Sequence, residues 1–108
     1  MEDQIFQQEL KGVFDSIDEK LKNELATFEK KCMSYNDVNQ FVSCMEQVVE
    51  KVEREQKNFE YRIAFLENKT QECLQRANEG KTDKEKCKQQ TRNSLVNYSD
   101  IFLFNIRK

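Results

Sequence analysis

Hydrophobic residues recur every three or four positions along most of this chain of 108 residues. That spacing is typical of one buried face of an α-helix. The first such stripe predicts a helix over residues 3–34, although it includes Gly12, and glycine disfavours a helix interior. The stripe consists of Phe6, Leu10, Val13, Phe14, Ile17, Leu21, Leu25, Phe28 and Cys32.

A second stripe predicts a helix over residues 38–78, about 60 Å long at 1.5 Å per residue. The apolar spacing is interrupted only at residues 54–58. These residues are mostly good helix formers and include neither glycine nor proline. The alternative is a turn at Lys57–Asn58. The stripe consists of Phe41, Val42, Met45, Val48, Val49, Val52, Phe59, Ile63, Leu66, Cys73, Leu74 and Ala77.

Two short segments carry the signals of turns. Residues 35–39, YNDVN, are rich in asparagine and aspartate, which favour turns and helix N-caps. Gly80 suits the position just after a helix, and Thr82 with Glu85 fits a capping box at the start of a third helix over residues 83–106. The sequence therefore predicts a single all-α domain over residues 1–108, an elongated three-helix bundle.

Composition excludes several other classes of protein. The chain has no proline and two glycines, which is too few turn residues for a β-rich domain. Its net charge of −2 and lack of a basic stripe argue against a nucleic-acid partner. It has no histidine and no glycine-rich loop, and carboxylate pairs such as Asp15/Asp18 and Glu53/Glu55 are interpreted as solvated. We expect no catalytic activity, no cofactor and no small-molecule substrate.

The four cysteines fall into two pairs around the predicted turns. Cys32 and Cys44 are twelve residues apart, and Cys73 and Cys87 are fourteen apart. Within one helix these separations would be about 18 and 21 Å, whereas a disulfide needs Cα atoms within about 7 Å. Each predicted turn lies between the two members of one pair. This coincidence favours two disulfide-stapled helical hairpins, each disulfide stabilising the fold by about 3 kcal/mol.

Three other roles for the cysteines remain open from the sequence. Pairing Cys44 with Cys73 and Cys32 with Cys87 would give one long hairpin that turns near residue 59. A structural zinc site would need all four cysteines, but their spacing lacks the close pairs that chelate zinc, so we expect no metal. Free cysteines buried as small core residues are the third alternative.

The C-terminal segment, YSDIFLFNIRK, is too apolar for one helix stripe, because consecutive positions on a helix are about 100° apart. We expect Leu103 and Phe104 to project away from the core. Exposed side chains of this size usually mark a contact surface. A protein partner is the first candidate and a membrane surface, flanked by Arg107 and Lys108, the second. The expected contact residues are Ile101, Phe102, Leu103, Phe104 and Ile106.

Helical hairpins clamped by cysteines resemble the twin-cysteine proteins of the mitochondrial intermembrane space, such as the coiled-coil-helix-coiled-coil-helix proteins and the small Tim chaperones. Residues 28–98 are similar to the group called family-with-sequence-similarity-136, which has four C-x₃-C motifs. Only Cys32, Cys44 and Cys87 occupy motif positions here, and no C-x₃-C or C-x₉-C is present. The counterparts are CMSYN (32–36), CMEQV (44–48), LENKT (66–70) and CKQQT (87–91), with KNFEYRIAFL (57–66) the best-matching segment.

The resemblance implies import into mitochondria without a cleaved leader and trapping by oxidative folding. The N-terminus, MEDQIFQQEL, resembles neither a secretory signal nor a transit peptide, and disulfides are rare in the cytosol. We therefore expect a structural or accessory subunit of a larger assembly facing the intermembrane space, such as a respiratory-chain complex. The alternatives are a small-Tim-like chaperone for hydrophobic precursors and a cytosolic coiled-coil adaptor with reduced thiols.

Overall fold

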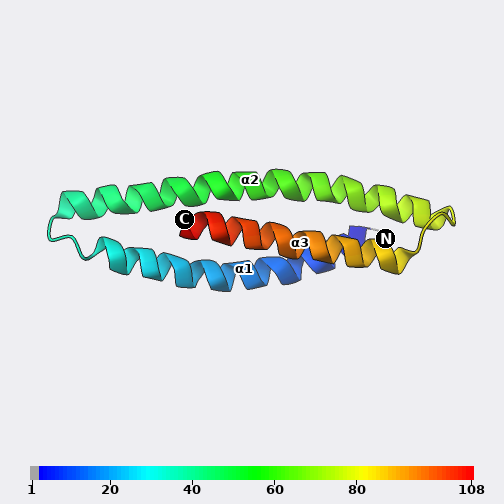
Figure 1. Ribbon diagram of the computed structural model, residues 1–108, viewed down its shortest axis with the longest axis horizontal. Helices are drawn as coiled ribbons and strands as arrows, with labels where there is room; N and C mark the ends of the chain where they lie inside the picture. Colours follow the sequence, from blue (N-terminus) through cyan, green and yellow to red (C-terminus); the bar gives the residue numbers. More distant parts are fainter. Residues whose placement is uncertain (1–2) are drawn as a thin grey trace.

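The computed structural model describes residues 3–108 and contains three helices (Figure 1). They are α1 (Asp3–Cys32), α2 (Val38–Asn78) and α3 (Lys84–Arg107). The predicted all-α fold is confirmed, and the predicted helix ends differ from these by at most two residues. α2 is continuous, so the alternative turn at Lys57–Asn58 is wrong.

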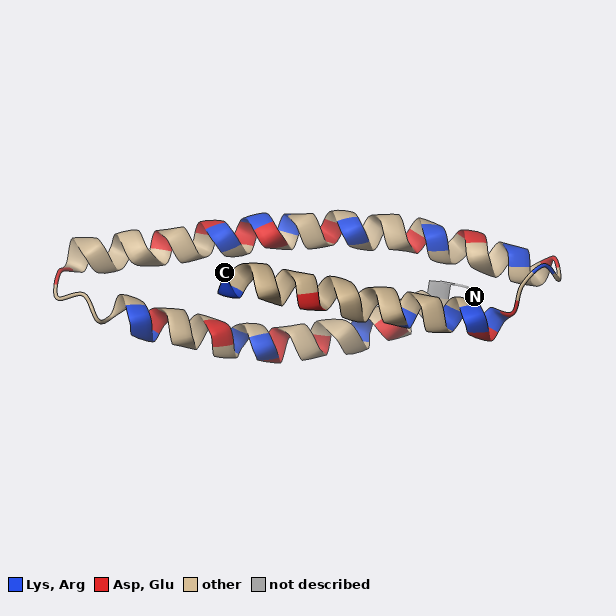
Figure 2. Cartoon of the chain, in the orientation of Figure 1, with Lys and Arg blue, Asp and Glu red and all other residues tan. Residues whose placement is uncertain are grey.

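The helices form a rod of 64 × 21 × 19 Å. α2 runs along its whole length, and α1 and α3 both pack antiparallel to it and against each other (Figure 1). α3 is shorter and ends before the turn that joins α1 to α2, so that end of the rod consists of two helices only. Charges of both signs are spread over all three helices, whereas the first two turns of α2 carry none (Figure 2).

Phe59 lies at the centre of the core and joins the three helices. Its ring contacts Phe14 of α1 edge-on, with centroids 5.9 Å apart, and Phe102 of α3, with centroids 5.5 Å apart. Around it the apolar stripes of all three helices bury their side chains, which is the main favourable contribution to folding. The buried residues of this cluster are Ile17, Phe59, Phe102, Leu103 and Ile106.

The interruption of the second apolar stripe at residues 54–58 has a structural explanation. Glu55 occupies a position that faces the core and is only 8% exposed. Its carboxylate accepts a hydrogen bond of 3.1 Å from Nδ2 of Asn105 on α3 and lies 4.0 Å from Nε of Arg54. The interpretation of Glu55 as solvated is therefore wrong, whereas Asp15, Asp18 and Glu53 are exposed as expected.

The turn after α2 depends on Gly80. Its φ is +77°, and its N–H donates to the carbonyl of Ala77 over 3.1 Å. The N–H of Lys81 donates to the carbonyl of Arg76 over 2.9 Å, which completes a Schellman motif. The prediction of Gly80 as the residue just after the helix is confirmed.

The N-cap residues of α2 and α3 are both aspartates. Asp37 accepts from the N–H of Asn39, and Asp83 accepts from the N–H of Glu85, each over 3.0 Å. The predicted capping box with Thr82 is therefore wrong by one residue. Asp83 directly follows and is at least as good an N-cap as threonine, because its carboxylate also favours the positive end of the helix dipole.

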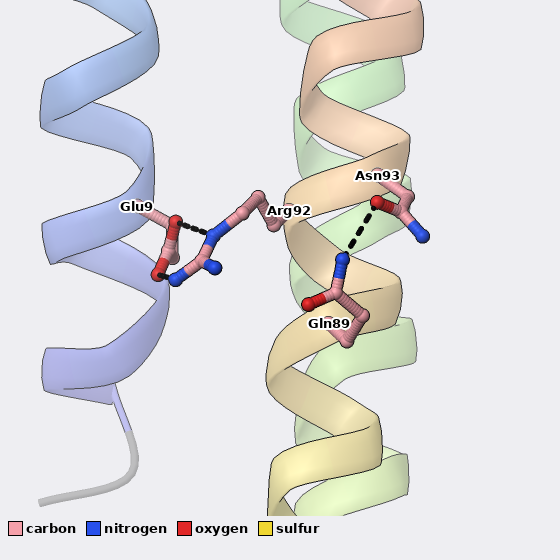
Figure 3. Close-up of polar contacts among 4 residues, drawn as sticks. All are labelled: Glu9, Gln89, Arg92 and Asn93. Carbon is pink, nitrogen blue, oxygen red and sulfur yellow. Dashed lines mark hydrogen bonds and ion pairs between the residues drawn. The ribbon is translucent and has the colours of Figure 1, made fainter.

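A bidentate ion pair fixes α1 against α3 (Figure 3). Arg92 donates from Nη2 and Nε to the two carboxylate oxygens of Glu9, over 2.7 and 3.0 Å. Gln89 and Asn93 form a further hydrogen bond of 3.0 Å along α3. The hydrogen bonds from Arg92 lower the pKa of the Glu9 carboxyl below its ordinary value.

We expect Gly80→Ala to lower the free energy of unfolding by about 1 kcal/mol, because a Cβ is disfavoured in the left-handed conformation. Chemical denaturation measures the change. The matched control is Gly12→Ala, in α1, where an added Cβ meets open space. It should raise the free energy of unfolding by about 0.5–1 kcal/mol, since alanine suits a helix interior better than glycine. A Gly80→Ala variant as stable as the unchanged protein would contradict the role of this turn.

We expect Glu9→Gln to lower the free energy of unfolding at neutral pH, by an amount that shrinks as the solution is acidified. The folded-state pKa of Glu9 lies below its ordinary value of 4.5, so its contribution is complete above that value. The contribution is lost as the pH falls through the lowered folded-state pKa. Denaturation of both proteins across this pH range, with the exposed Glu29→Gln as control, measures the difference. A difference independent of pH would contradict the ion pair as its source.

Candidate protein interface

All four cysteines are joined in disulfides that cross the two turns. Cys32 pairs with Cys44, with Cα atoms 5.6 Å apart, and Cys73 pairs with Cys87, with Cα atoms 5.7 Å apart. The predicted pairing is confirmed. The nested pairing of Cys44 with Cys73 and Cys32 with Cys87 is wrong. The zinc site and the free buried cysteines are wrong as well, because both required cysteines outside disulfides.

The two disulfides lie in different surroundings. Cys73 and Cys87 are buried beside Leu74 and Ala77, where α2 meets α3. One helical turn from this disulfide, toward the middle of the rod, the hydroxyls of Thr70 and Thr91 form a hydrogen bond of 2.7 Å. This bond is buried between the same two helices. This disulfide therefore lies in the buried interface of α2 and α3, beside an open pocket that Thr70, Cys73, Cys87 and Thr91 help to line.

The Cys32–Cys44 disulfide lies at the two-helix end of the rod. Cys32 is 1% exposed and Cys44 is half-buried. α3 reaches only as far as the ion pair between Arg107 and Glu24 on α1. Residues of α1 and α2 beyond this level pack on each other without a third helix (Figure 1). The covalent bond therefore holds together the part of the rod with the smallest core.

The structure separates the residues of the C-terminal segment into buried and exposed ones. Phe104 is 63% exposed, as expected. Leu103 is only 3% exposed, so the prediction that it projects away from the core is wrong. Its neighbours Phe102 and Ile106 are also buried, and Ile101 is half-buried. α3 packs against α1 and α2 together, which buries a sector wide enough for two consecutive residues.

As a consequence, most of the expected contact residues belong to the core of this chain. Of the five, Phe104 is the one whose side chain is largely free to meet a partner. The predicted contact surface therefore contracts to a single aromatic ring at the end of α3.

The larger exposed apolar surface lies elsewhere and was missed by sequence reasoning. Val42 and Val49 belong to the second stripe, yet they are 45% and 50% exposed because only two helices pack at this end. The sequence does contain a signal for this surface: residues 41–42 and 48–49 are consecutive apolar pairs, which make the stripe wider than one helix contact can bury. The exposed large hydrophobic residues are Phe14, Met33, Tyr35, Val38, Val42, Val49, Tyr61, Phe65, Val96 and Phe104.

Comparison with known proteins finds no family model, curated protein or solved structure that matches this chain. Among the described residues, no helix is both long and apolar enough to cross a membrane.

We expect the two disulfides to protect different parts of the rod. Cys32→Ser/Cys44→Ser should lower the free energy of unfolding by about 3 kcal/mol and speed amide exchange chiefly over residues 25–52, where α3 does not cover the hairpin. Cys73→Ser/Cys87→Ser should cost a similar free energy but speed exchange around residues 70–95. Denaturation and hydrogen exchange measure both effects. Indistinguishable exchange patterns in the two variants would contradict this division.

Proposed function

We propose that the protein is a non-enzymatic accessory subunit that binds other proteins of a larger assembly in the mitochondrial intermembrane space, such as a respiratory-chain complex. In this role the rod acts as a rigid element that spans or braces its partners.

The observation that carries the proposal is the use of every cysteine in a disulfide across a helical turn. Such bonds form and persist in oxidising compartments. Helical hairpins closed by cysteines are also the feature that the twin-cysteine proteins of the intermembrane space share. Both arguments support that compartment.

A role in protein binding is supported by the exposed apolar side chains. Val38 is 75% exposed, Met33 65% and Phe104 63%. Large apolar side chains in water lose favourable burial, and clusters of them usually mark a binding surface. A partner that covers them would recover the burial that this thin rod does not provide by itself.

The test is isolation of the protein from its native source with free thiols blocked before lysis. We expect mass spectrometry to find Cys32–Cys44 and Cys73–Cys87 links, and native fractionation to find the chain at constant stoichiometry in a large complex. An oligomer built of this chain and similar small proteins would instead favour the chaperone. Four blocked thiols would overturn the proposed compartment and favour the cytosolic adaptor.

Two glycosylation sequons distinguish the intermembrane space from the secretory pathway, which is also oxidising. They are Asn68-Lys69-Thr70 and Asn97-Tyr98-Ser99, and both asparagine side chains are exposed. We expect no shift in mass upon endoglycosidase treatment, and Asn68→Gln/Asn97→Gln serves as the unglycosylated standard. Glycans at either asparagine would overturn the mitochondrial location.

A further inference from the structure

An uncovered apolar stripe runs along the N-terminal part of α2. It consists of Val38, Val42, Met45 and Val49, whose spacing of four, three and four residues places them in one line along the helix. Val38, Val42 and Val49 are 75%, 45% and 50% exposed, and Met45 is half-buried. This spacing is that of the a and d positions of a coiled coil, so the stripe has the form of one side of a helix–helix contact.

The stripe lies at the end of the rod where the third helix is absent. α3 ends near the level at which Asn105 binds Glu55 of α2, and Val38–Val49 lie beyond it toward the turn (Figure 1). At the turn itself, an open pocket lined by Met33, Tyr35, Val38 and Phe41 extends the apolar surface. Around Phe59, α2 packs against both other helices, whereas here it packs against α1 alone.

Charges define what can cover this stripe. Residues 38–45, at the start of α2, carry no charge (Figure 2). The next acidic residues are Glu46, Glu50 and Glu53, and all three side chains are exposed. Glu46 follows Val42 by four residues and Glu53 follows Val49 by four, so each carboxylate lies beside a residue of the stripe. An apolar stripe with an acidic edge complements a helix whose own apolar stripe has a basic edge.

The same charges argue against a second copy of this chain as the occupant. In a two-fold antiparallel pair through the stripe, Glu46 and Glu53 of one copy would lie along the edge that faces the same residues of the other. Carboxylates would meet carboxylates, which disfavours the contact.

We propose that this stripe binds one amphipathic helix of a partner protein, with apolar residues at alternating three- and four-residue spacing and lysine or arginine along one edge. The contact extends from Val38 to Glu53, about 22 Å or four helical turns. This inference rests on the proposed function, since it names the kind of partner segment that the subunit binds. The Cys32–Cys44 disulfide contributes by keeping α1 and α2 together at this end, so that the stripe is preformed.

The first test measures binding of two synthetic amphipathic helical peptides of about 18 residues to the full chain. They share leucines at the a and d positions and differ in having lysines or glutamates along one edge. We expect the lysine peptide to bind about tenfold more tightly, and Val42→Ser/Val49→Ser to weaken it about tenfold by loss of apolar burial. Tyr61→Ser/Phe65→Ser, which removes exposed aromatic rings elsewhere on α2, should leave it unchanged.

A charge reversal sharpens the test. Glu46→Lys/Glu53→Lys should reverse the preference and favour the glutamate peptide. These side chains are exposed, so the variants should keep the helical circular dichroism of the unchanged chain. Equal binding of both peptides, or unchanged binding to Val42→Ser/Val49→Ser, would overturn the inference. A dimer of the chain that dissociates in Val42→Ser/Val49→Ser would overturn it in favour of a second copy.

The second test separates this inference from the proposed function. A photoreactive phenylalanine analogue is placed at Val42 and, as control, at Phe65, and cross-linking is done in the native source. We expect position 42, and not position 65, to link to a helical segment with a basic edge. Co-purification with a large complex but cross-links elsewhere, or within this chain, overturns this inference alone. A chain that migrates alone in native extracts overturns both proposals.

Discussion

The continuity of α2 is the constraint on which the rest of the structure depends. α2 spans the full length of the rod, and each of the other helices is joined to one of its ends by a short turn and a disulfide. Because both turns reverse the chain onto the same long helix, α1 and α3 must lie along it and meet in the middle. The three-helix core around Phe59 is the result.

Unequal helix lengths then divide the rod into two parts. Where all three helices overlap, each buries a wide apolar sector, and even polar groups such as Glu55, Thr70 and Thr91 find partners inside. Where α3 is absent, α2 cannot bury the full width of its stripe. The chain holds this thinner part together with a covalent bond, and its exposed apolar surface is available for another protein. The proposed helix-binding stripe follows from this division.

α1 and α3 are not consecutive in the sequence, and ion pairs between their side chains fix their relative position. Glu9 pairs with Arg92 and Glu24 with Arg107, in each case across 83 residues. Both pairs lie at partly exposed positions and contribute orientation more than stability, since exposed ion pairs gain little in water. They align the two helices along α2 in one register.

The sequence by itself determined the all-α class and the helix ends within two residues, and it favoured the continuous α2 and the observed pairing of the cysteines over the alternatives that it left open. These are local properties: hydrophobic spacing, the left-handed preference of Gly80 and the position of each turn between two cysteines act over a few residues. Only the tertiary structure decided which side chains are covered. Leu103 is buried because both other helices pack against α3, and Glu55 is buried beside Asn105, which belongs to another helix. Val42 and Val49 stay exposed because no third helix packs against that part of α2. Exposure depends on what lies opposite each residue, and helix periodicity alone does not contain that information.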